Sequence, residues 1–214
     1  MAAGAEAGKP VRKRRPQERA EATRRKLVEV ALKEFSERGF DAVTVRDIEV
    51  AAGVQRNLLS YHFGNKEEMW KAAAAHVITK LQDFQEQRQD LMRELSPHER
   101  LTYTIRSYVR FSAGNPELNR LMIQEGKRDS WRIHWLVEEF MRPAMEGLRE
   151  VVEADTRIDD RQFVHWYYVF VSGAMMFSMA PEAALLFDVD VTDDEVVDRH
   201  AQTMATLLLK EFPR

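Results

Sequence analysis

The chain has 214 residues, of which 44% are hydrophobic and 31% are charged. This composition is that of an ordinary globular protein, and it excludes a mostly disordered, collagen-like or mini-protein class. The chain contains no cysteine, which excludes disulfides, thiolate catalysis, iron–sulfur clusters and zinc ribbons together.

Positive and negative charges concentrate in different parts of the chain. Residues 1–66 hold 14 Lys or Arg and 9 Asp or Glu, a net charge of +5, whereas residues 67–214 hold 18 and 26, a net charge of −8. A basic first third followed by an acidic remainder indicates that one end of the protein meets a polyanion. Nucleic acid fits this pattern best, because its phosphates attract Lys and Arg.

Two features bear on the location of the protein. No apolar segment follows the basic N-terminus, so a signal peptide is not expected. The 18 residues Phe163–Ala180 carry no formal charge and reach the lower limit for a membrane span. They include His165 and two serines but no Leu or Ile, and Pro181 closes them. We therefore expect this stretch to be buried on every side, in a cytoplasmic, nucleoid-associated protein with no membrane partner.

The pattern along the chain predicts an all-α fold. Residues 1–17 form a predicted basic, disordered tail, in which Arg12–Arg15 is either a solvated run or an arm that contacts DNA. From Glu18 onward apolar residues recur at helical spacing, and no alternating strand pattern is present. Pro143 is expected to kink the helix that contains it. About nine helices are predicted, over residues 18–38, 44–51, 55–61, 65–90, 97–113, 116–126, 129–153, 160–180 and 193–211.

The segment Thr44–Lys66 predicts a helix-turn-helix. Two short helices flank Gly53, which can adopt a positive φ at the turn between them. Their inward faces carry small and aliphatic residues, namely Val45, Ile48, Ala52, Val54, Leu58 and Leu59. This pattern is typical of two helices crossed at a wide angle, with the second free to enter the major groove of DNA. The bland alternative is a pair of crossed helices within a bundle.

Polar residues around the second helix are the candidate contacts to DNA. Arg suits guanine, and Asn or Gln suits adenine, because each can pair with a base edge. Tyr61, His62 and Lys66 suit phosphate oxygens better, and Lys66 also lies at a helix start, where free N–H groups favour an anion. The predicted DNA-binding residues are Thr44, Arg46, Gln55, Arg56, Asn57, Ser60, Tyr61, His62 and Lys66.

The stretch from Val43 to Trp70 resembles the DNA-binding region of TetR-family transcriptional regulators. The resemblance is carried by Ile48, Ala52-Gly53-Val54, Leu59, Tyr61-His62-Phe63 and Lys66-Glu67-Glu68. It implies a three-helix DNA-binding domain over residues 18–64. It also implies a larger helical domain over residues 65–214 that dimerises through its last two long helices and holds a small-molecule pocket. Three departures concern the operator sequence: Glu49 replaces the usual Ala, Asn57 a frequent Gly, and Ser60 a common Tyr.

Aromatic residues of the second domain are the candidate ligand-binding residues. A binding pocket is mainly apolar with aromatic walls, although packing in the core or at a dimer interface explains any single one of them as well. The predicted pocket residues are Tyr103, Trp131, Trp135, Trp166 and Phe170. The expected homodimer forms through helices 160–180 and 193–211.

Together these patterns predict a DNA-binding transcriptional regulator. We expect a repressor that binds a near-palindromic, double-stranded operator as a homodimer and is released by a small lipophilic effector. A second hypothesis is a helical interaction protein on the same scaffold that has lost operator binding, with Glu49 and Ser60 as signs of that loss. No catalytic or metal-binding motif is present, so we expect no enzymatic activity, no metal and no cofactor.

Overall fold

The computed structural model describes residues 14–210, and every regular element in that range is helical, which confirms the predicted all-α fold. The chain divides into two compact units, the first ending at Ala73 and the second beginning at Ala74. This division lies inside a helix that starts at Lys66 and continues from one unit into the other. The expected domain boundary between residues 64 and 65 lies just before that helix.

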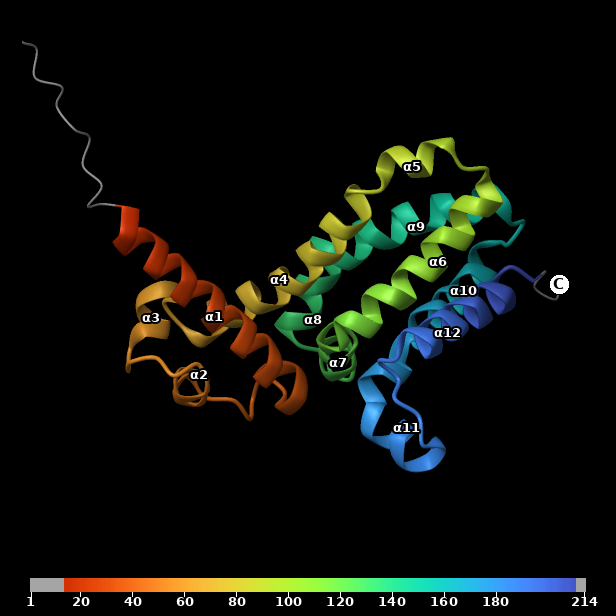
Figure 1. Cartoon of the computed structure of the whole chain (residues 1–214). Helices are drawn as coiled ribbons and strands as arrows, with labels where there is room; N and C mark the ends of the chain where they lie inside the picture. Colours follow the sequence, from red (N-terminus) through yellow and green to blue (C-terminus); the bar gives the residue numbers. More distant parts are fainter. Residues whose placement is uncertain (1–13, 211–214) are drawn as a thin grey trace, which may run out of the picture. The chain divides into compact units, whose positions relative to one another are not determined.

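The described part of the first unit, residues 14–73, contains three helices and the start of a fourth (Figure 1). They are α1 (Arg14–Arg38), α2 (Val45–Ala51), α3 (Leu58–Phe63) and α4 (Lys66–Glu86). Helix α1 begins four residues before the predicted start, so the predicted tail is wrong for residues 14–17. Pro16 does not oppose helix here, because the first-turn N–H groups lack an intrahelical partner anyway. The rest of the predicted tail, residues 1–13, lies outside the described residues.

A small apolar core holds the first unit together. One face of α1 is apolar and inward, and three of its residues have no exposed area at all. Residues on the inward faces of α2, α3 and the first turns of α4 are also buried. The buried side chains of this unit include Leu27, Ala31, Phe35, Ile48, Ala52, Leu59, Met69 and Trp70. Burial of this apolar surface fixes two helices that are too short to be stable alone.

The second unit continues α4 and adds the remaining helices. They are α5 (Gln89–Glu94), α6 (Pro97–Gly114), α7 (Pro116–Glu125), α8 (Trp131–Leu136), α9 (Arg142–Asp155), α10 (Asp160–Gly173), α11 (Ala180–Phe187) and α12 (Asp194–Leu208). A π-helical turn, Val137–Met141, joins α8 to α9, and a 3-10 turn, Ala174–Met179, joins α10 to α11.

Three predicted helices are subdivided, each for a local reason. The predicted helix 65–90 breaks at residues 87–88, and α5 follows the break. The predicted helix 129–153 is divided by the π-helical turn, and Pro143 lies in the first turn of α9, where its missing N–H is tolerated. The kink expected at Pro143 stays a prediction. Pro181, interpreted from the sequence as the end of a helix, lies instead in the first turn of α11. Proline is common both in the first turn of a helix and just after a helix end, so the sequence alone does not distinguish the two positions.

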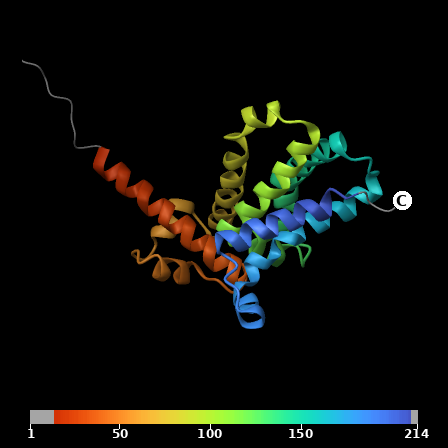
Figure 2. The ribbon, with the colours of Figure 1, turned by 45° about the vertical axis from the view of Figure 1, so that its right-hand side comes forward.

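Helix α6 is central to the second unit, and it packs against α9 on one side and α12 on the other (Figures 1 and 2). Helix α10 lies along α12, and its inner face supplies Phe163, Trp166 and Phe170 to the core. The buried Trp166 indole N–H donates to the carbonyl of Leu208 across this contact, at 3.1 Å. The hydrogen bond of Trp166 and the burial of its apolar neighbours therefore both hold α10 against the end of α12.

The approach of α10 to α12 is closest at Gly173. A Cβ at this position would collide with the Sδ and Cε atoms of the buried Met204. The carbonyl of Gly173 is also a hydrogen-bond partner of the His200 Nε2, at 2.6 Å. A larger residue at the end of α10 would therefore force the Met204 side chain to move.

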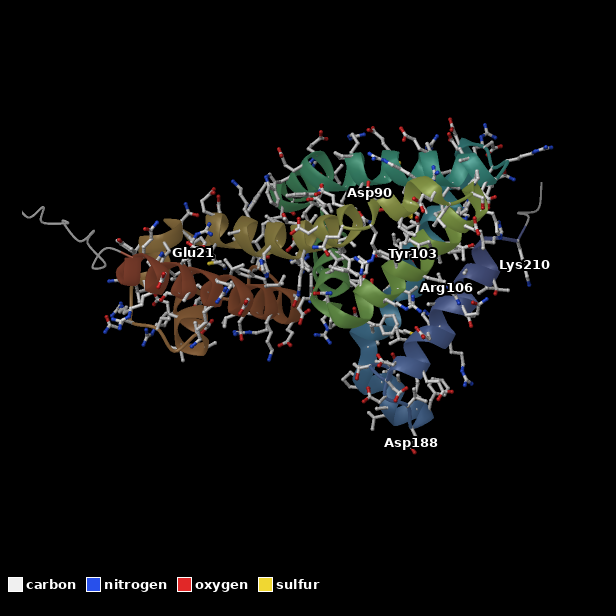
Figure 3. All side chains as sticks on the ribbon, turned by 45° about the horizontal axis from the view of Figure 1, so that its top comes forward. Glu21, Asp90, Tyr103, Arg106, Asp188 and Lys210 are labelled. Atoms are coloured by element: carbon white, nitrogen blue, oxygen red, sulfur yellow. The ribbon has the colours of Figure 1, made fainter. Side chains whose placement is uncertain are left out.

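The outer face of α10 and nearly all of α11 are apolar and exposed. Helix α10 exposes Val164, Tyr168 and Val169, and α11 exposes Leu185 through Phe187, with Leu185 88% exposed. The prediction that Phe163–Ala180 is buried on every side is therefore wrong for the single chain, because one face of α10 is exposed in the part of the chain that the structure describes. Figure 3 shows Asp188 at the outer end of α11, far from Lys210 beyond α12.

One stretch of the described chain, Asp160–Phe187, is long and apolar enough to cross a membrane by length and composition alone. Its 28 residues include a window of mean hydropathy 1.5, of which 17% is buried. The same stretch is interrupted by the 3-10 turn and supplies Trp166 and Phe170 to the core of the second unit. The stretch is therefore not one continuous α-helix, and part of it belongs to the core of the second unit.

Candidate DNA-binding site

Helix α2 begins at a capping box. The Thr44 hydroxyl accepts a hydrogen bond from the Asp47 amide at 3.1 Å, and the Asp47 carboxylate accepts one from the Thr44 amide at 2.9 Å. Hydrogen bonds from the Thr44 backbone and side chain, together with the Arg38 guanidinium, lower the pKa of Asp47. The start of α2 is therefore fixed by local hydrogen bonds. Thr44 takes part in these bonds and is still exposed to solvent.

The turn between α2 and α3 uses two residues with left-handed backbone. Gly53 has φ 62°, and its N–H donates to the Val50 carbonyl at 3.0 Å. Asn57, directly before α3, has φ 69°. The predicted helix 55–61 therefore starts three residues too early, because Asn57 interrupts right-handed helix at that point. Gln55, Arg56 and Asn57 lie in the turn leading into α3, whereas Ser60 to His62 lie on the helix.

The predicted contact residues gather over α2, the turn, α3 and the first residue of α4. Most are exposed, and Tyr61 is 80% exposed. The side chain of Arg46 is 60% exposed, and Arg56 makes no hydrogen bond or ion pair with any residue that the structure describes. His62 and Lys66 are half-buried: the Lys66 ammonium lies over the Phe40 ring, 4.2 Å from its centroid. A compact, polar and partly cationic surface results, with aromatic side chains beside it.

The structure adds a buried carboxylate to this site that the sequence did not single out as a site residue. Glu49 of α2 is only 2% exposed, and its Oε1 accepts the backbone N–H of Leu59 in the first turn of α3, at 3.3 Å. Its Oε2 lies 3.7 Å from the Arg46 guanidinium. The available signal was the replacement of Ala by Glu within the motif, but the sequence does not reveal the partner of that carboxylate.

The candidate pocket residues fall on three helices of the second unit. Trp166 and Phe170 are buried on α10, with ring centroids 5.3 Å apart, and form part of the main core. Trp131 and Trp135 lie on α8, where Trp135 meets Phe140 edge to face. Tyr103 lies on α6 and is half-buried (Figure 3). A pocket lined by all five stays a prediction.

A hollow of about 470 Å³ lies elsewhere in the second unit. It is formed by the 3-10 turn, the segment after α11 and the start of α12, and none of the five candidate pocket residues lines it. Apolar side chains and charged ones alternate around it, including Met176, Val189, Val196, Arg199 and His200. Among residues 14–210 no group of three or more His, Asp or Glu side chains is arranged to hold a metal ion.

Helices α1 to α3, with a glycine turn and an exposed polar second helix, define a helix-turn-helix DNA-binding unit, followed here by a larger all-helical unit. Residues 27–73 match the sequence model described as "Bacterial regulatory proteins, tetR family". This match to the TetR family lies within the first unit.

Two curated relatives match part of the chain. The HTH-type transcriptional repressor KstR2 of Mycobacterium tuberculosis is 50% identical over 46 residues, which is 22% of this chain and 23% of KstR2. The HTH-type transcriptional regulator TtgR of Pseudomonas putida is 41% identical over 59 residues, 28% of each chain. The chain thus matches about a quarter of the length of these relatives.

A likeness to solved structures extends further but concerns the fold alone. The transcriptional regulator FadR from Bacillus subtilis, solved in complex with stearoyl-CoA, aligns with a TM-score of 0.63 at 15% identity. The alignment covers 88% of this chain and 99% of that one. The helical fold of this chain is therefore similar to that of FadR.

The left-handed backbone at Asn57 generates a prediction for stability. Asn57→Gly is expected to leave stability unchanged or slightly raised, whereas Asn57→Ala is expected to lower the free energy of unfolding by about 1 kcal/mol, because a Cβ is disfavoured at positive φ. Thermal unfolding of the two variants measures the difference. Ser60→Ala, an exposed change on right-handed helix, is the control, and equal stability of the Ala and Gly variants at position 57 would contradict the assignment.

Proposed function

We propose that this chain is a transcriptional regulator that binds an operator as a repressor. The observation that carries the proposal is the exposed surface of α2, the turn and α3, where Arg46, Arg56 and Tyr61 face solvent over a buried apolar base. Side chains of this kind supply both base-edge and phosphate contacts when α3 lies in a major groove. The names of the relatives KstR2 and TtgR, a repressor and a regulator, support the same function.

The alternative is a helical interaction protein that keeps the scaffold without operator binding. The two functions separate in one titration of the full chain against DNA flanking its own gene, followed by anisotropy. A repressor binds one fragment far more tightly than random duplex of equal length, whereas the alternative protein shows no preference.

Two single substitutions should affect DNA binding in different ways. Arg56→Ala is expected to change sequence preference, with a loss of about 1–3 kcal/mol at the operator if Arg56 pairs with a guanine. Lys66→Ala is expected to weaken all duplexes alike and to reduce the salt slope by about one, because Lys66 contacts a phosphate. Anisotropy titrations at several salt concentrations measure both effects.

Lys127→Ala, which removes a charge from the loop before α8, is the matched control and should leave the salt slope unchanged. Equal operator affinity for the wild type and a Tyr61→Ala/Lys66→Ala double variant would contradict this placement of the binding surface.

We further propose a homodimer formed by the outer faces of α10 and α12. The exposed apolar residues of α10 and the exposed Leu207 of α12 occupy neighbouring helices, and exposed apolar patches of this kind mark interaction surfaces. Two such helices from each protomer form a four-helix bundle about a two-fold axis. A two-fold dimer presents two α3 helices to successive major grooves, roughly 34–36 Å apart, on a near-palindromic operator.

Sedimentation velocity at micromolar concentration is expected to give a dimer. Tyr168→Glu combined with Val169→Glu should give a folded monomer, because both charges fall on the proposed interface and would lose water on association. Leu91→Glu, at an exposed apolar position on α5, is the control and should stay dimeric. A well-folded wild-type monomer under these conditions would refute the proposed interface.

We also propose a lipophilic effector that releases the operator. The second unit is rich in aromatic residues, with Trp131 and Trp135 on α8 and Tyr103 on α6 as proposed wall residues beside Trp166 and Phe170. The fold relative FadR is described in complex with stearoyl-CoA, a lipophilic ligand. Helix α4 belongs to both units and is the element through which a change in the second unit reaches the first. An effector acts only through its different affinities for the two states.

A screen of apolar compounds, long-chain acyl thioesters included, by tryptophan quenching tests this effector. A true effector is expected to quench the wild type and to weaken operator binding about 5–150-fold, a typical range for allosteric coupling. Trp131→Phe and Trp135→Phe should each reduce the quenching, whereas Trp70→Phe, in the core of the first unit, should not. If no compound both quenches and releases the operator, this part of the proposal fails while DNA binding stands.

A further inference from the structure

We propose that Glu49 is a positioning residue that sets how strongly the helix-turn-helix discriminates operator from other DNA. The inference rests on the proposed DNA-binding function and adds a residue that does not itself touch DNA. Its two carboxylate oxygens have separate partners: the backbone of α3, through Leu59, and the exposed Arg46. One side chain therefore acts on both the placement of α3 and the charge available to phosphates.

The first partner fixes α3. Asn57 makes no side-chain cap hydrogen bond to the start of this helix, so its first amides depend on other acceptors. The Glu49 Oε1 supplies one for Leu59, whose side chain is fully buried. A charged acceptor makes a stronger hydrogen bond than a neutral one, and loss of a buried acceptor leaves an unsatisfied N–H. Glu49 thus holds α3 at one position against α2.

A backbone hydrogen bond from the same residue supports this placement. The Glu49 carbonyl accepts the Val54 N–H at 3.0 Å, just past the glycine turn. Glu49 therefore contacts both ends of the connection between the two helices, through its main chain at Val54 and through its side chain at Leu59.

The second partner concerns charge. Arg46, one turn before Glu49 on α2, is 60% exposed, and its guanidinium lies 3.7 Å from the buried carboxylate. A carboxylate at this distance competes with a phosphate for the same guanidinium. Non-specific DNA binding depends almost wholly on such phosphate attraction. By partly neutralising Arg46, Glu49 lowers affinity for any duplex and leaves the contribution of α3 to base recognition intact.

A buried ion pair in the second unit shows what a purely structural arrangement looks like in this chain. Glu125 and Arg132 join the end of α7 to α8 at 2.7 Å, and both side chains are buried, at 3% and 11% exposure. In the Glu49 pair only the carboxylate is buried, while the cation remains in solvent next to the candidate contacts. Because of this asymmetry, the Arg46 guanidinium lies where DNA can reach it.

The decisive variant is Glu49→Gln, which has nearly the same shape and can still accept the Leu59 N–H through its amide oxygen. It removes the negative charge beside Arg46. We expect tighter binding to random duplex, with a salt slope steeper by up to about one, because Arg46 becomes free to neutralise a phosphate. Operator affinity rises less than random-duplex affinity, so the ratio between them falls. Anisotropy titrations on both duplexes at several salt concentrations give all three quantities.

Two further variants separate the roles of the two oxygens. Glu49→Ala removes both partners and is expected to lower operator affinity about tenfold through displacement of α3, the equivalent of one buried hydrogen bond to a charged group. Arg46→Ala combined with Glu49→Gln should have the same salt slope as Arg46→Ala alone, because the Glu49→Gln effect acts through Arg46. If Glu49→Ala does not fold, the salt slopes of Glu49→Gln and of its combination with Arg46→Ala still test the proposal.

Glu34→Gln is the matched control. It removes one carboxylate from the same unit, paired with Arg38 at 2.6 Å, without contact to α3. Its salt slope should equal that of the wild type. The proposal is overturned if Glu34→Gln and Glu49→Gln shift the slope alike, if Glu49→Gln leaves the slope and the ratio unchanged, or if its effect persists without Arg46. A wild type with no operator preference would instead refute the proposed function.

Discussion

The candidate DNA-binding face depends on apolar burial beneath two very short helices. Helices α2 and α3 have seven and six residues, below the length at which a helix holds its shape in water. Ile48, Ala52 and Leu59 anchor them, each without exposed area. The exposed polar residues have defined positions only because these side chains are buried, so the small core of the first unit is a condition for any recognition of bases.

Much of this unit could be predicted from the sequence, because its determinants are local. The capping box at Thr44, the small Ala52 and the positive-φ Gly53 each require a particular residue type at a particular place. Helix α3 starts later than the sequence predicts, because Asn57 takes a left-handed conformation that asparagine adopts only in some contexts. The role of Glu49 could not be predicted, since a pattern of residues does not specify which backbone amide a carboxylate will reach.

The second unit was predictable in outline but not in its interior. Helical spacing identified its helices and its apolar faces, and Trp166 and Phe170 do turn inward. Periodicity says which residues avoid water, but not whether they meet one another, a ligand or a second chain. Helix α10 illustrates this, because its apolar residues divide between an inner face against α12 and an outer face with no neighbour in the single chain. A helix that is apolar all round therefore signals a partner as readily as a core.

Helix α4 has a practical consequence for exchanging parts between regulators. It runs unbroken from Lys66 to Glu86, and the division between the units falls within it, after Ala73. A chimaera joined at that point inherits one helix from two parents, and its helical phase must match on both sides. One residue inserted or deleted there turns everything downstream by about 100° and shifts it by about 1.5 Å along the axis. Junctions that keep whole turns therefore preserve the geometry on which a two-fold partner and a palindromic duplex would both depend.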